Sequence, residues 1–131
     1  NRHSHQSLQP GLYGLSNARL DTGWPKVERG KEMLRQKIAQ PKLSTDELLK
    51  ILAATDIAPD DQLPNTGISL EWERLLSAIC IQGKDYGTRS STVLLIDKQG
   101  QVCFHEKQIA PHNSSESRIE FKLDPPCKIH S

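Results

Sequence analysis

The sequence has no long apolar run, no excess of charge of either sign and few cysteines. No apolar stretch approaches the roughly 18 residues that a membrane-spanning helix needs. Seventeen basic and sixteen acidic residues give a net charge of +1, so there is no electrostatic case for nucleic acid or an anionic membrane as a partner. The three cysteines, Cys80, Cys103 and Cys127, are too scattered for a disulfide scaffold or a zinc site. We predict a cytoplasmic chain without a transmembrane segment or a metal centre.

An initiator Met and a basic-then-apolar leader are also missing, so no signal peptide is visible. We interpret Asn1 as a start partway through a larger protein. The length of 131 residues fits one domain or part of one, and the apolar fraction of 35% is low for an ordinary soluble domain. We expect residues 1–9 and 124–131 to be poorly ordered.

Two stretches carry clear helix signals. Pro25 is well placed as a first helical residue, and the apolar residues after it recur at helical spacing, which predicts a helix over 25–40. Ser44 and Glu47 form a capping box, in which each side chain would bond the backbone N–H of the other residue. The box predicts a second helix over 44–54. A helical turn over 70–76 follows a long polar loop.

Branched and apolar residues predict strands over 12–15, 77–83, 88–97, 101–109 and 119–123. The last of these alternates apolar with charged residues, which is typical of an edge strand with one buried face. The run from Val93 to Ile96 does not alternate, so we expect both faces of its strand to be covered. The two helices can cover one face. The other cover must come from elsewhere, and the residues before Asn1 are our candidate. The fold class is α+β, with an antiparallel sheet and two packing helices.

Common catalytic motifs for phosphate, dinucleotide, zinc and serine chemistry are absent from the sequence. Asn17 follows a strand-like run, where its amide could donate to a developing oxyanion or bond local backbone in a turn. Arg89 opens a strand, where its forked charge could pair with a carboxylate or lie on the surface of a hairpin connection. Spacing alone favours the structural role for both residues. Asp21 we interpret as a turn residue.

Histidines and cysteines offer weaker candidates. His3 and His5 could form a metal pair, but in a polar terminus we expect them to be solvated. We expect His105 to be a half-exposed surface residue. Cys80 and Cys103 fall in predicted strands, and buried free cysteines behave as small apolar residues. None of these residues predicts a cofactor.

Two sequence blocks nevertheless resemble a known family. The stretches "GLYGLSNARLDTGWPKVERGK" (11–31) and "DYGTRSSTVLLIDKQGQVCFHEK" (85–107), with "LEWERLLSAICIQG" between them, are similar to the C-terminal half of the NRDE family. That family is similar to transport and Golgi organisation protein two of animals. The resemblance covers residues 8–123. It identifies residues 1–131 as the C-terminal portion of a single domain of this family.

The resemblance implies an N-terminal-nucleophile-hydrolase-like αββα sandwich, in which an N-terminal Cys attacks an amide and its α-amino group serves as base. Asn17 would then stabilise the oxyanion, and Arg89 would orient the site. This sequence has neither that Cys nor the Asn-Arg-Asp-Glu motif. We therefore expect C–N hydrolysis only when the chain is joined to the missing N-terminal half, and no activity from the chain alone.

The resemblance also implies an alternative, a non-catalytic protein that binds or carries haem or an acyl lipid. No cofactor is required by the sequence itself, and the small-molecule ligand is unknown. In both hypotheses the missing N-terminal half is the expected partner. Without it, we expect exposed apolar surface and a tendency to self-associate.

Overall fold

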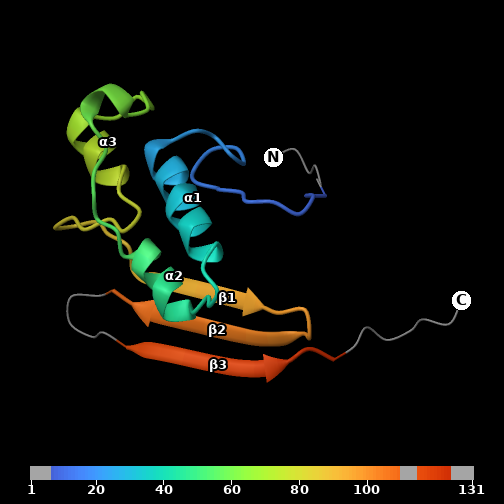
Figure 1. Ribbon diagram of the computed structural model, residues 1–131. Helices are drawn as coiled ribbons and strands as arrows, with labels where there is room; N and C mark the ends of the chain where they lie inside the picture. The colour runs from blue at the N-terminus through green and yellow to red at the C-terminus, as the bar shows by residue number, and fades with distance from the viewer. Residues whose placement is uncertain (1–6, 110–114, 125–131) are drawn as a thin grey trace, which may run out of the picture.

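A computed structural model describes residues 7–109 and 115–124, and Figure 1 shows three helices on one side of a three-stranded sheet. The helices are α1 (Pro25–Ile38), α2 (Thr45–Leu52) and α3 (Leu70–Leu76). The strands are β1 (Ser90–Ile96), β2 (Gln101–Gln108) and β3 (Glu116–Lys122). A single 3-10 turn, Asp60–Gln62, lies in the loop between α2 and α3. The α+β class with an antiparallel sheet is confirmed. His3, His5 and Cys127 lie outside the described residues.

The helix starts follow the local signals in the sequence. Pro25 is the first residue of α1, as predicted. The Glu47 N–H donates to the Ser44 hydroxyl at 3.3 Å, so Ser44 caps α2. The return half of the capping box is wrong, because the Glu47 carboxylate binds Lys37 and Lys50 instead. Two ammonium groups outcompete one backbone N–H for the same carboxylate.

The sheet is antiparallel with strand order β1-β2-β3. Gly100 closes the turn between β1 and β2 with φ of 77°, and its N–H donates to the Asp97 carbonyl at 3.0 Å. The register places Val93 opposite His105 and His105 opposite Arg118. These three residues therefore share one face of the sheet, because neighbours across strands point to the same side.

Two predicted strands are wrong. Residues 77–83 form only an isolated bridge between Gln82 and Gly87, because partners outside any strand take two of the segment's backbone donors. The Cys80 N–H donates to the Ala54 carbonyl at 2.8 Å, and the Ile81 N–H donates to the Thr88 hydroxyl at 2.9 Å. The apolar content of this segment reflects the burial of Ala78 and Cys80 and not the pairing of a strand.

The second wrong strand is 12–15, which pairs with no strand among the described residues. A pair of hydrogen bonds, which we call the clasp, instead holds this segment to a turn. The Asp21 N–H donates to the Gly14 carbonyl at 2.7 Å, and the Gly14 N–H donates to the Asp21 carboxylate at 2.7 Å. Asp21 has φ of 54°, a left-handed conformation that Asp tolerates better than most residues. The clasp confirms Asp21 as a turn residue and closes a loop from 14 to 21.

The core lies between the helices and one face of the sheet. Its buried apolar residues are Val27, Leu49, Ile51, Ala58, Ala78, Cys80 and Val93. Val102 is also buried, but it lies on the opposite face of the sheet, in register with Ile96 and Phe121. We expected both faces of β1 to be buried, and this expectation is wrong for the described part of the chain. Leu94 and Ile96 are 55% and 56% exposed. The prediction of a half-buried last strand is also wrong, since every residue of β3 is exposed. The described helices lie on the side of the sheet opposite to Leu94, Ile96, Ile119 and Phe121 (Figure 1).

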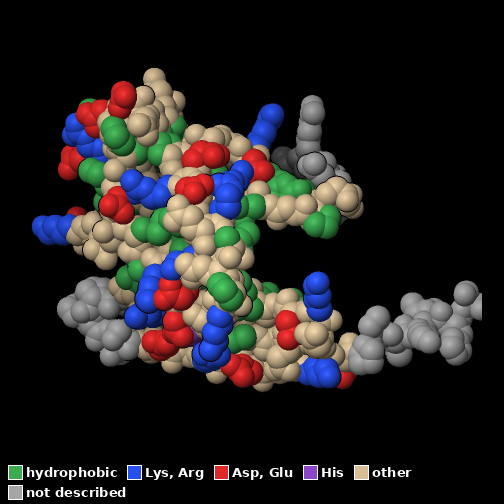
Figure 2. Space-filling model, viewed as in Figure 1, with side chains coloured by type: hydrophobic (Ala, Val, Ile, Leu, Met, Phe, Trp, Pro, Cys, Tyr) green, Lys and Arg blue, Asp and Glu red, His purple; other side chains and the backbone are tan. Residues whose placement is uncertain are grey.

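Charged side chains of both signs are interspersed over the face drawn in Figure 2, without a large area of one sign. The longest described helix, α1, has 14 residues. Within the described part of the chain, no helix has the length and apolar content needed to cross a membrane.

Candidate functional site: an apolar cavity with a polar end

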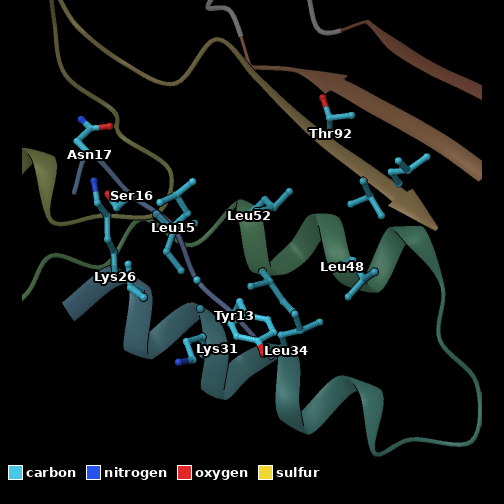
Figure 3. A pocket seen from close by; sticks show the side chains of 17 residues that line it. Tyr13, Leu15, Ser16, Asn17, Lys26, Lys31, Leu34, Leu48, Leu52 and Thr92 are labelled. Atoms are coloured by element: carbon cyan, nitrogen blue, oxygen red, sulfur yellow. The ribbon is translucent and has the colours of Figure 1, made fainter. Parts of the chain in front are cut away.

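A cavity of about 580 Å³ lies between the segment 13–17, α1, α2 and the edge strand β1. Figure 3 shows the side chains around it. Its wall is largely apolar and includes Tyr13, Leu15, Leu34, Leu48, Ile51 and Leu52. Cavities of this size and composition, with a few polar groups, are typical of small-molecule sites.

One end of the cavity is polar. Figure 3 shows Ser16, Asn17 and Lys26 gathered there, away from Leu48. The Lys26 ammonium donates to the Leu76 carbonyl at 2.9 Å and lies 5.9 Å from the centre of the Trp24 ring. Burial lowers the pKa of Lys26, because the charged form loses part of its hydration.

The second lysine of the cavity, Lys31, supports the wall itself. It donates to the Asp21 carboxylate at 2.9 Å, next to the clasp with Gly14. The hydrogen bond from Lys31, followed by that from the Gly14 backbone, lowers the pKa of Asp21. The segment that carries Asn17 is thus tied to α1 through one carboxylate.

The chemistry of the lining limits what the cavity can do. Among the described residues that line it there is no Cys, His, Asp or Glu. The lining thus provides an amide, two ammonium groups and the hydroxyls of Tyr13, Ser16 and Thr92. Such a set can bind and orient a ligand, and it can stabilise a negative charge.

The two residues singled out from the sequence are not both at this cavity. Asn17 lines it and also a second cavity of about 340 Å³ beside Trp24 and α3. Arg89 is exposed and lines neither cavity; its carbonyl accepts the Ile109 N–H at 2.9 Å just before β1. The roles proposed for Asn17 and Arg89 remain predictions.

A buried histidine cluster was missed by sequence reasoning. The expectation of a half-exposed His105 is wrong, since its side chain is 1% exposed. Its Nδ1 lies 2.8 Å from the Thr45 hydroxyl and its Nε2 lies 2.7 Å from the Glu116 carboxylate. Donor atoms of Asp46, His105 and Glu116 lie within 4.8 Å of one another. These residues come from three separate elements, so no local signal in the sequence joins them.

Comparison with known proteins places the chain in a family. A family model described as Transport and Golgi organisation 2 matches residues 1–111. The Transport and Golgi organization protein 2 homolog of Bos taurus is 36% identical over 127 residues, which cover 88% of this chain and 46% of the relative. The corresponding protein of Homo sapiens is 34% identical over 128 residues, with the same coverage. The chain spans about half the length of the curated relatives it matches. By the family match and these relatives, and in agreement with the NRDE-family resemblance, the chain belongs to the Transport and Golgi organisation 2 family.

Proposed function

We propose that this part of the family's fold binds a small molecule with an apolar body and an anionic group. The observation that carries this proposal is the apolar cavity with Asn17 and Lys26 at one end. Acyl lipids and haem both have this chemistry. The names of the relatives refer to transport and Golgi organisation, and carriage of such a ligand fits those words.

Lys26 is the residue we expect to meet the anionic group. In the described part of the chain no carboxylate forms an ion pair with it, in contrast to Lys31. Its pKa is lowered by burial alone, so a bound anion would restore the stabilisation that the ammonium lost with its water. The apolar wall would hold the body of the ligand, with hydrophobic burial supplying most of the affinity.

The test is a titration with a fluorescent fatty acid, and separately with haem, followed by fluorescence and by the Soret band. We expect Lys26→Met to weaken binding at least tenfold, because a charge-assisted hydrogen bond contributes about 1.5–3 kcal/mol and about 1.4 kcal/mol is a factor of ten. Lys42→Met removes the same charge from an exposed position outside the cavity, and should leave the affinity unchanged. Absence of binding for both probes, or equal loss in both variants, would contradict the proposal.

A second candidate function is amide hydrolysis by a longer family member. The position of Asn17 at the polar end favours it, because an amide that lines the cavity can donate to a developing oxyanion. In this proposal the fold is an N-terminal-nucleophile-hydrolase-like αββα sandwich in the cytoplasm, and the nucleophile is an N-terminal Cys supplied from outside this chain. Arg89 would act as an orienting residue there. The chain alone should hydrolyse no member of a panel of amides, and measurable turnover would show this view to be wrong.

A further inference from the structure

The buried imidazole of His105 and two carboxylates form a cluster away from the ligand cavity. Donor atoms of Asp46, His105 and Glu116 lie within 4.8 Å of one another. None of these three residues lines either of the cavities that Asn17 and Lys26 share. Asp46 and Glu116 instead line a third cavity, of about 330 Å³. The cluster is therefore a separate candidate site, and it goes beyond the function proposed above.

The fold brings the three residues together from three elements. Asp46 lies in the first turn of α2, which packs over the sheet (Figure 1). His105 belongs to β2, and Glu116 is the first residue of β3. The register pairs His105 with Arg118. Glu116, two residues earlier on β3, therefore points to the same face and is a diagonal neighbour of the imidazole, within reach of a long side chain.

One donor of the cluster is fixed and the other two can adjust. His105 is 1% exposed, and the Thr45 hydroxyl, 2.8 Å from Nδ1, holds the ring with Nε2 towards Glu116. Metal-ligating imidazoles are oriented by such a bond at the other ring nitrogen. Asp46 and Glu116 are exposed, so their carboxylates can rotate to meet an ion. Donors around a tetrahedral Zn²⁺ lie roughly 3.3 Å apart, which is between the 2.7 Å from Nε2 to Glu116 and the 4.8 Å limit of the cluster.

The contact between His105 and Glu116 calls for a positive charge. Their ring nitrogen and carboxylate oxygen are 2.7 Å apart, and an ionised carboxylate can only accept, so a proton lies between the two atoms in the metal-free molecule. A divalent cation would take the place of that proton. The ammonium groups nearby leave the position free for it. Lys50, which lines the same cavity, is bonded to Glu47, and Glu116 is bonded to His105 rather than to Lys107 opposite it in the register.

We propose that Asp46, His105 and Glu116 bind a Zn²⁺ ion, with the remaining coordination position at the cavity that the two carboxylates line. An imidazole donor favours Zn²⁺ over Mg²⁺ and Ca²⁺, which take oxygen ligands. Three protein ligands and one open position are typical of zinc sites that hold a water or a substrate. The ion would join α2, β2 and β3. It would thereby fasten β3, whose residues are all exposed, to a helix.

The first experiment is a calorimetric titration of the 131-residue chain with ZnCl₂. Histidines and a cysteine outside the described residues are first replaced by Ala or Ser, so that they do not compete for the ion: His3, His5, His112, His130 and Cys127. Asp46→Asn and Glu116→Gln then each remove one proposed ligand from an exposed position. Circular dichroism of each variant checks that the chain is folded.

Each ligand variant has a matched control. Glu71→Gln is the control for Asp46→Asn, because both carboxylates are exposed at the second position of a helix with a serine cap. Glu120→Gln is the control for Glu116→Gln, because the two residues lie on the same face of β3 and are about equally exposed, at 53% and 52%.

We expect the chain to bind one Zn²⁺ ion. Loss of an outer-shell partner typically costs about 10–100-fold in metal affinity, so removal of a direct ligand by Asp46→Asn or Glu116→Gln should weaken binding at least tenfold. Glu71→Gln and Glu120→Gln should leave the affinity unchanged. The proposal is overturned by absence of saturable binding, by an equal loss in ligand variants and controls, or by equally tight binding of Mg²⁺.

A second measurement reads the imidazole itself. His105 is the one histidine left in the titrated chain, so NMR spectra of the ring nitrogens report on it alone. Zn²⁺ should move the Nε2 resonance, while Nδ1 keeps a proton that it donates to the Thr45 hydroxyl. An unchanged Nε2 resonance at saturating Zn²⁺ would show that the ion binds elsewhere, and would refute the site even if the calorimetric affinity is high.

Discussion

Removal of the hydroxyl that holds the buried imidazole should destabilise the fold. Thr45→Val keeps the shape of a side chain that is 2% exposed, but it removes the partner of His105 Nδ1 at 2.8 Å. The imidazole is 1% exposed, so water cannot easily replace the lost bond. A buried polar group left without a partner costs about 1–3 kcal/mol, and we expect the free energy of unfolding to fall by that amount.

The assay is urea denaturation at neutral pH, followed by circular dichroism. Thr92→Val is the matched control. It also removes a threonine hydroxyl that forms a side-chain hydrogen bond, here to the Glu106 carboxylate, but at an exposed position. Surface substitutions of that kind usually change stability by less than about 0.5 kcal/mol. If Thr45→Val and Thr92→Val lower the free energy of unfolding equally, the reasoning that burial makes the His105 bond important is refuted.

Two further predictions concern the turn at Gly100 and the ion pairs of Glu47. Gly100→Ala should destabilise the fold by about 1 kcal/mol, because its φ of 77° is strained for a residue with a Cβ. The control Gly23→Ala, at a position with open space around it, should have little effect. Equal changes of the melting temperature in the two variants would contradict this prediction. The hydrogen bonds from Lys37 and then Lys50 lower the pKa of Glu47 from 4.5 to about 2. Since that pKa is depressed on folding, its stabilisation is present above pH 4.5 and is lost as the pH falls towards 2. Glu47→Gln should lack this part of the acid dependence in urea titrations, while Glu28→Gln should keep it.

The sequence predicted the helices well because their signals are local. Pro25 and Ser44 act through the backbone groups of their own first turn, so their effect does not depend on the rest of the fold. The hairpin of β1 and β2 was predictable for the same reason, through the glycine at its turn. The strand predicted over 77–83 failed because Ala54 and Thr88, which are not its neighbours in sequence, bind its backbone.

The candidate site was predictable only in part. Asn17 was singled out from its position before a turn, and it does line the cavity. The lysines around the cavity and the burial of His105 could not be predicted, because they depend on contacts between distant elements. Thr45 and His105 are 60 residues apart in the chain, and only the packing of α2 on the sheet brings them together.

The clasp between Gly14 and Asp21 fixes the two ends of a loop and leaves the residues between them outside its hydrogen bonds. The ends of the loop from 14 to 21 are bonded to each other, and Asp21 is also bonded to Lys31. Asn17 is an exposed residue within that loop. The loop can therefore vary in sequence between its fixed ends without disturbing the helices beneath it. In the proposed function, a change of the residues around position 17 would alter the polar end of the cavity and leave the clasp in place.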